Sequence, residues 1–152
     1  MTDNGVRFVL IGGYAAIVHG SPIGTEDVDV CAPLDEDNLA RILAAVADLH
    51  PRFRMRPDKP PVPTDPGALK GFKNLYLHTD LGPMDFLSEV TGIGGYDEVS
   101  RHTVGTQVGG YPCRVLDLDG LIRSKRAVGR PKDLRGVAEL EAIRRRLEQQ
   151  VD

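Results

Sequence analysis

The stretch from Arg7 to Cys31, RFVLIGGYAAIVHGSPIGTEDVDVC, decides the fold of this chain. It opens with the short apolar run Arg7 to Ile11, which predicts a strand, and continues through the glycine pair Gly12-Gly13 into a short helix that begins at Tyr14. After a loop, the run from Asp27 to Cys31 alternates polar and apolar residues, which is typical of a half-buried strand. The stretch therefore predicts a strand, a tight turn, a helix and a second strand.

The rest of the chain also carries sequence signals for helices, hairpins and loops. Asp35 is the expected N-cap of a helix. Six of the eleven prolines fall between Pro51 and Pro66, so a long loop without regular structure is expected there. The other expected elements are a hairpin over residues 72–87, a hairpin over residues 103–115 that turns at Gly109-Gly110, a helix capped by Asp117 or Asp119, and a helix whose first turn holds Pro131.

Length and composition favour one ordinary globular domain, because the chain has 152 residues, 41% of them hydrophobic and 27% charged. Within it we expect a core over residues 6–115 and a basic helical segment over residues 116–150. No apolar run is long enough to span a bilayer and no signal peptide precedes the first strand, so a cytoplasmic protein with no membrane partner is expected. Cys31 and Cys113 lie too far apart, and without nearby ligand spacing, for a zinc site or a disulfide framework.

Charge is unevenly distributed along the sequence. Residues 121–152 contain nine Arg or Lys against five Asp or Glu, a net charge of +4, which leaves −7 for residues 1–120. An acidic body facing a basic segment suits a site in which carboxylates hold a metal and basic side chains hold phosphates. A solvated, arginine-rich helix explains the same charge equally well.

The glycine pair and the aspartates that follow it are the residues best suited to chemistry. Gly12-Gly13 at a helix start leaves backbone N–H groups open to a phosphate, although a tight turn without a ligand needs the same residues. Asp27 and Asp29 are expected on one strand face about 7 Å apart, from a rise of ~3.3 Å per residue. Two such carboxylates can converge on one hard cation such as Mg²⁺, and their mutual repulsion favours that interpretation over a solvated strand face.

Asp85 is a lone acid between the apolar residues Met84 and Phe86 of another expected strand. A third carboxylate opposite the first two would ligate a second metal ion or act as a base toward an attacking hydroxyl. Alternation along a strand predicts an exposed polar residue at this position as well, so Asp85 alone indicates no site.

Taken together, these motifs resemble the nucleotidyltransferase superfamily of the DNA polymerase β type. The likeness is carried by Leu10 to Gly13, by His19-Gly20, by Thr25 to Val30 and by the downstream Asp85. It extends to small bacterial members, which include the toxin components of toxin–antitoxin and abortive-infection systems. The resemblance implies an α+β fold, with a nucleotidyltransferase-type mixed β-sheet flanked by helices and followed by a C-terminal helical segment.

The C-terminal runs Leu121 to Arg126 and Gly129 to Leu134 are similar to a second motif of that group. The resemblance implies a catalytic and metal-binding set of Asp27, Asp29 and Asp85, holding one or two Mg²⁺ ions. It implies a nucleotide-binding set of Gly12, Gly13, Thr25, Lys125, Arg126, Arg130, Lys132 and Asp133. Each basic residue of that set, taken singly, fits a solvated helix equally well.

The sequence departs from such relatives at three places. Only six residues precede Arg7, where the relatives carry a helix, so either that helix is missing or the chain is short. Ile23-Gly24 stand where a basic residue is common, and Gly136 stands where a further acid commonly follows.

The resemblance implies a Mg²⁺-dependent nucleotidyltransferase that moves a nucleoside monophosphate from an NTP, ATP among them, to an acceptor hydroxyl. The resemblance leaves the acceptor open among RNA, a protein side chain and a small molecule, and it points to a toxin–antitoxin-type system with a cognate antitoxin or a second copy of the chain as partner. The alternative is a catalytically inactive nucleotide-binding or regulatory module that acts with a partner protein. A plain α+β interaction domain without a ligand requires all the motifs to coincide by accident.

Overall fold

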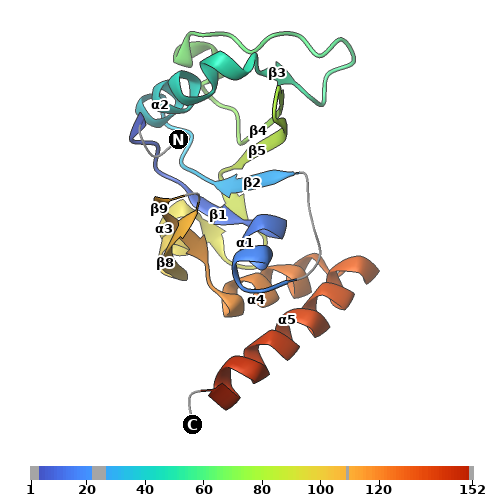
Figure 1. Cartoon of the computed structure of the whole chain (residues 1–152). Helices are drawn as coiled ribbons and strands as arrows, with labels where there is room; N and C mark the ends of the chain where they lie inside the picture. The colour runs from blue at the N-terminus through green and yellow to red at the C-terminus, as the bar shows by residue number, and fades with distance from the viewer. Residues whose placement is uncertain (1–3, 22–26, 109, 151–152) are drawn as a thin grey trace.

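The computed structural model describes residues 4–21, 27–108 and 110–150. Its strands form one large mixed sheet and one small sheet (Figure 1). The large sheet contains β1 (Val9–Ile11), β2 (Val28–Cys31), β3 (Arg52–Phe53), β4 (Asn74–Thr79), β5 (Gly82–Leu87), β8 (Thr103–Val108) and β9 (Tyr111–Leu116). The small sheet contains β6 (Glu89–Val90) and β7 (Gly94–Gly95).

The two strands predicted around the glycine turn lie at the centre of the large sheet, whose order is β3-β4-β5-β2-β1-β9-β8. Strand β1 pairs antiparallel with β2, so that Ile11 lies opposite Asp29, and parallel with β9. Strand β2 pairs parallel with β5. Both predicted hairpins are confirmed: β4 pairs antiparallel with β5, and β8 pairs antiparallel with β9, although Gly109 of the second turn lies outside the described residues.

The helices begin near the predicted caps. Asp35 accepts a hydrogen bond from the Asn38 amide and caps the first long helix, while Asp117, and not Asp119, caps the helix after β9. The helices are α1 (Gly12–Val18), α2 (Glu36–Val46), α3 (Tyr96–Ser100), α4 (Leu118–Val128) and α5 (Pro131–Gln150), with short 3₁₀ turns η2 (Ala47–Leu49) and η3 (Pro66–Leu69). None of the helices in the described residues is long and apolar enough to span a bilayer.

The fold class expected from the sequence is confirmed, since the mixed sheet is flanked by helices and ends in a helical segment. Figure 1 shows α2 beside the β3–β4–β5 end of the sheet, and α1, α4 and α5 beside its other part. The buried side chains of both parts form one hydrophobic core, in which Leu39 and Ile42 of α2 and Leu140 of α5 are all 2% exposed or less. The carboxylate-bearing strands β2 and β5 therefore run between two helical layers.

The expectation of a long loop without regular structure from Pro51 to Pro66 is wrong at its start. Strand β3 lies there, pairing antiparallel with β4, and Arg52 forms a further bridge with Pro61. Phe53 is 7% exposed and its ring stacks on that of Phe72, with ring centroids 6.0 Å apart. This strand is stabilised by tertiary pairing and aromatic packing, so local periodicity gave no signal for it.

Asn38 ties the segment before β1 to the start of α2. The side chain is fully buried, its Oδ1 accepts from the Arg7 amide at 2.9 Å, and its Nδ2 donates to the carbonyls of Arg7 and Pro33 at 3.1 and 2.7 Å. Because buried polar groups are costly without partners, this amide fixes the path of the chain into the central strand.

We expect Asn38→Ala to lower the free energy of unfolding by about 2–4 kcal/mol, because it leaves buried backbone groups without partners and opens a cavity. Urea denaturation measures the change. The neighbouring Asp37→Ala, an exposed change that removes only the ion pair with Arg41, is the control and costs about 0.5 kcal/mol. Equal costs for the two variants would contradict this role of Asn38.

Candidate active site

Asp29 and Asp85 lie opposite each other on the adjacent parallel strands β2 and β5. Register partners on neighbouring strands point to the same face, so the two carboxyl groups are neighbours. The next strand places Tyr76 of β4 opposite Asp85. The register of three strands thus aligns two acids and a tyrosine in one row across the sheet.

The environment of Asp29 disfavours its ionised form. Burial, followed by the charges of Asp85 and Asp27, raises the pKa of Asp29 from 3.8 to about 6, while Arg54 acts in the opposite direction. Asp27 is exposed and directly precedes β2. Near neutral pH the site therefore holds several negative charges that repel one another, a situation that a bound cation relieves.

Arg54, which directly follows β3, is a site residue that sequence reasoning missed. Its Nη2 donates to both carboxylate oxygens of Asp85, at 2.7 and 2.6 Å, and its guanidinium lies 5.7 Å from the centroid of the Tyr76 ring. The Arg54 Nε is buried without a hydrogen-bond partner. The alternation of Arg52, Arg54 and Arg56 gave no usable signal for it, because the chain is extended only over Arg52 and Phe53 and Arg56 lies over the Phe53 ring.

An open cleft with a volume of about 770 Å³ lies between the start of α1, the site face of β2 and the helices α4 and α5. Asp29 lies on one wall and the basic side chains of α4 and α5 lie on the other, including Arg135, which the sequence did not single out. The predicted residues that line the cleft are Gly12, Gly13, Asp29, Lys125, Arg130, Lys132 and Asp133.

The other predicted residues are placed differently. Asp85 does not line the cleft, but it lies beside Asp29, which does. Arg126 does not line the cleft either, because its guanidinium pairs with Glu141 of α5. Thr25 lies outside the described residues. Among the residues that are described, no group of three or more His, Cys, Asp or Glu side chains is arranged to hold a metal ion, so Asp27 is not drawn together with Asp29 and Asp85 into one ligand set.

Local packing positions the basic side chains of α4 and α5 that line the cleft. A Cβ atom at Gly136 would come 3.2–3.3 Å from Cδ, Cε and Nζ of Lys125, so the glycine gives the lysine room to lie across α5. Arg130 donates from Nε to Oδ2 of the buried Asp133 at 2.7 Å, and this hydrogen bond lowers the pKa of Asp133. Asp133 therefore orients Arg130 at the start of α5 and offsets part of its charge.

Gly12 brings the backbone of α1 close to the carboxylate. Its φ is +67°, and an added Cβ would lie 2.8 Å from Oδ2 of Asp29. Both the left-handed conformation and the short distance require glycine at this position.

Comparison with known proteins gives little beyond this geometry. No family model matches the chain, and no curated protein matches it. Among solved structures, one that is similar is the crystal structure of a protein from Thermotoga maritima described as "a putative nucleotidyltransferase". It is 15% identical, the match covers 98% of this chain and 86% of that one, and the TM-score is 0.49. A likeness of this extent carries no argument about the activity or the site residues of this chain.

We expect Gly12→Ala to destabilise the protein by about 1–3 kcal/mol more than Gly20→Ala does, because a clash with the Asp29 carboxylate adds to the backbone strain. Gly20 is the matched control, since its φ is +106° but no atom lies within 4 Å of an added Cβ. Urea denaturation of both variants measures the difference. Equal destabilisation would show that the approach of Asp29 to Gly12 has no energetic consequence.

We expect Asp29→Asn to stabilise the protein at pH 7.5 and to have little effect at pH 4. The folded pKa of Asp29, about 6, lies above its unfolded value, so wild-type stability falls as the pH rises from about 4 through about 6. The substitution removes this loss, which is on the order of 1–3 kcal/mol above pH 7.

Urea midpoints measured between pH 4 and pH 8 test this dependence. Asp58→Asn, which removes an exposed carboxylate from the proline-rich segment, is the control and should shift stability equally little at every pH. A gain from Asp29→Asn that does not vary with pH would contradict the raised pKa.

Proposed function

We propose that this protein is a nucleotidyltransferase that transfers a nucleoside monophosphate from an NTP to an acceptor hydroxyl and releases pyrophosphate. The observation that carries the proposal is the in-register pair Asp29 and Asp85 beside a cleft whose opposite wall is basic. A nucleoside triphosphate matches this distribution of charge, because its phosphates need cations along the chain and a metal-binding acid group near the reacting phosphorus.

The donor set agrees with Mg²⁺ as the cofactor. Carboxylate oxygens are the ligands that Mg²⁺ prefers, and the raised pKa of Asp29 marks repulsion that a cation would relieve. Asp29 and Asp85 would hold one or two ions, and Asp27 would have to turn toward them to join the set. The ions when bound would neutralise phosphate charge and favour ionisation of the acceptor hydroxyl.

The protein's own groups have separate tasks in this reaction. Lys125, Arg130 and Lys132 would bind the β- and γ-phosphates and stabilise the charge that develops on pyrophosphate, while backbone N–H groups at Gly12-Gly13 approach the phosphates. The acceptor oxygen forms a bond to the α-phosphorus as the bond from that phosphorus to the pyrophosphate oxygen breaks. The hydroxyl proton passes to the carboxylate pair, which is placed to act as the base.

The setting of the reaction is part of the same proposal. The resemblance of Leu10 to Gly13, Thr25 to Val30 and Asp85 to small bacterial nucleotidyltransferases supports a toxin–antitoxin-type system, with a cognate antitoxin or a second copy of the chain as partner. ATP is the first nucleotide to test in that setting.

A nucleotide-binding module without turnover is the second candidate. The observation that favours it is the position of Arg54, which contacts both carboxylate oxygens of Asp85 and so competes with any metal or hydroxyl proton for them. Measurements of nucleotide binding and of turnover distinguish the two candidate functions. Both functions require the cleft, but only the transferase requires Arg54 to release the Asp85 carboxylate.

We expect an NTP at one hundred times its Kd, with Mg²⁺, to raise the melting temperature by about 5–10 °C, because a ligand that binds only the folded state stabilises it by mass action. The double variant Asp27→Ala/Asp29→Ala should lose this shift. Asp48→Ala/Asp58→Ala removes two exposed acids elsewhere and should keep it. Thermal unfolding with each NTP, with and without Mg²⁺, followed by pyrophosphate release in the presence of RNA or protein acceptors, measures both steps.

Each outcome decides between the candidates. Mg²⁺-dependent stabilisation with pyrophosphate release supports the transferase, and stabilisation without release under any acceptor supports the binding module. If no nucleotide changes the melting temperature, both are contradicted.

A further inference from the structure

A second basic segment lies on the far side of the carboxylate pair from α4 and α5. Residues 50–78 carry six Arg or Lys against two Asp, a net charge of +4, whereas residues 1–49 and 79–120 together carry four against fifteen, a net charge of −11. This segment contains β3 and β4, the two strands that continue the sheet beyond β5. The acidic strands are therefore bordered by basic chain on both sides.

The side chains of β4 separate cleanly between the two faces of the sheet. Leu75, Leu77 and Thr79 are buried, which places them toward the core that α2 covers. The intervening residues of β4, which are half-buried or exposed, point to the opposite face, the face of Asp85. We name this surface the β3–β4 face, formed by Arg52, Arg54, Asn74, Tyr76 and His78.

Contacts within the β3–β4 face hold an aromatic ring among hydrogen-bonding groups and cations. Asn74 donates from Nδ2 to the Tyr76 hydroxyl at 3.1 Å, and the guanidinium of Arg54 lies over the Tyr76 ring. Arg52 lies opposite His78 in the β3–β4 register, and both are exposed. The face leads directly to the site, because Tyr76 is the register partner of Asp85.

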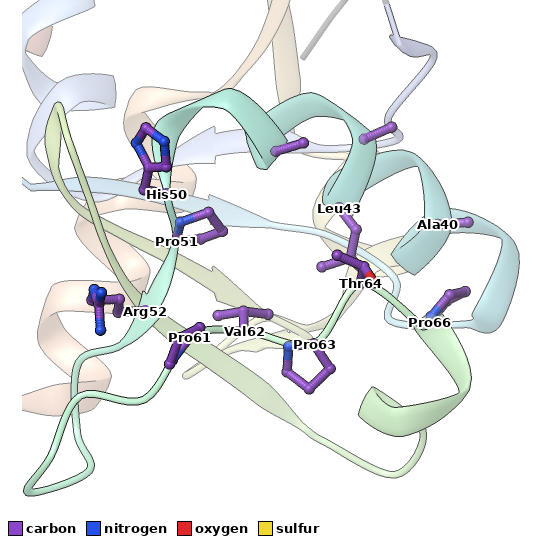
Figure 2. A pocket seen from close by; sticks show the side chains of 12 residues that line it. Ala40, Leu43, His50, Pro51, Arg52, Pro61, Val62, Pro63, Thr64 and Pro66 are labelled. Atoms are coloured by element: carbon purple, nitrogen blue, oxygen red, sulfur yellow. The ribbon is translucent and has the colours of Figure 1, made fainter.

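The two residues of the β3–β4 face nearest the carboxylate pair, Arg54 and Tyr76, line neither the cleft beside Asp29 nor the apolar groove of about 520 Å³ between α2 and residues 61–64. Arg52, on the outermost strand of the sheet, does line that groove (Figure 2). Figure 1 shows α4 and α5 well away from β3 and β4. A small molecule would bind too little surface on an open face, and a protein partner would need an apolar centre that these five side chains lack.

We propose that the β3–β4 face binds a single-stranded polynucleotide, whose terminal hydroxyl is the acceptor of the transfer reaction. Cations for the phosphates, an aromatic ring and a guanidinium plane for stacking, and an amide for base edges are the groups by which proteins bind single strands. The inference rests on the proposed function: the terminal oxygen bonds to the α-phosphorus, pyrophosphate leaves, and the proton passes to the carboxylate pair. The nucleotide and the acceptor thus approach Asp29 and Asp85 from opposite sides.

Binding is tested without nucleotide or metal, so that it is measured independently of transfer. The probes are fluorescently labelled 12-nucleotide single strands of mixed sequence, one of RNA and one of DNA, and anisotropy of the full-length protein in EDTA gives Kd. Tyr76→Ala should weaken binding by about fivefold to a hundredfold, the range observed when a stacking aromatic is removed. Arg52→Ala, which removes an exposed guanidinium and its hydrogen bond to the Lys59 carbonyl, should reduce the slope of log Kobs against log salt by about 0.7.

Arg114→Ala is the matched control, because it removes an exposed arginine from β9 on the far part of the same sheet. It should leave both Kd and the salt slope unchanged. Absence of binding, or equal weakening by Arg52→Ala and Arg114→Ala, overturns the proposal even if an NTP with Mg²⁺ still stabilises the protein, which would leave the proposed function standing.

A second measurement tests the acceptor role. With Mg²⁺ and an NTP, a strand with a free 3′ hydroxyl should be extended by at least one nucleotide, releasing one pyrophosphate for each nucleotide added, whereas a 3′-deoxy strand should bind equally well without reacting. The RNA and DNA strands distinguish the two sources of such a hydroxyl. Pyrophosphate release only with a protein acceptor, or strand binding without any response to an NTP, overturns the acceptor role.

Discussion

The pairing of two carboxylates across parallel strands is the constraint around which this structure is arranged. The β2–β5 register places Asp29 beside Asp85, and partial burial makes their repulsion costly. Three neighbours accommodate it: Gly12 offers no side chain, Arg54 binds Asp85, and Asp27 stays exposed at the start of β2. A sheet that keeps such a pair in its central strands is unfavourable for stability alone, which is why the pair points to a cation or to proton transfer.

The sequence of basic and acidic segments matches this arrangement. The two basic segments, residues 50–78 and 121–152, lie on opposite sides of the acidic strands in the fold although they are more than forty positions apart in the chain. In the proposed reaction, phosphate groups would be attracted to the basic segments on either side, which would bring the reacting phosphorus and an incoming hydroxyl together at the acids. The sheet topology thus places segments that are far apart in the sequence, and opposite in charge to the acidic strands, on the two sides of those strands.

Residues with a local signal were predictable from sequence, and residues positioned by tertiary pairing were not. Gly12-Gly13 and the alternation through Asp29 correctly predicted β1, β2 and a helix between them, because a positive φ and a half-buried strand leave clear patterns, although α1 begins at Gly12 and not at Tyr14. Arg54 was missed because a two-residue strand has no periodicity to detect. Arg126 was grouped with Lys125 by its position in the motif, yet consecutive residues on a helix face different directions, and it pairs with Glu141 instead.

Arg54 balances the charge of the carboxylate pair in the folded protein. Its guanidinium supplies the positive charge that the carboxylate pair requires, so the folded protein avoids two unpaired acids. The arrangement is incomplete, however, because the buried Arg54 Nε has no partner and one nitrogen serves both oxygens of Asp85, in place of a two-nitrogen bidentate contact. A cation at the carboxylates would therefore replace an imperfect ion pair, and the released guanidinium would lie beside Tyr76, where a phosphate or a base can use it.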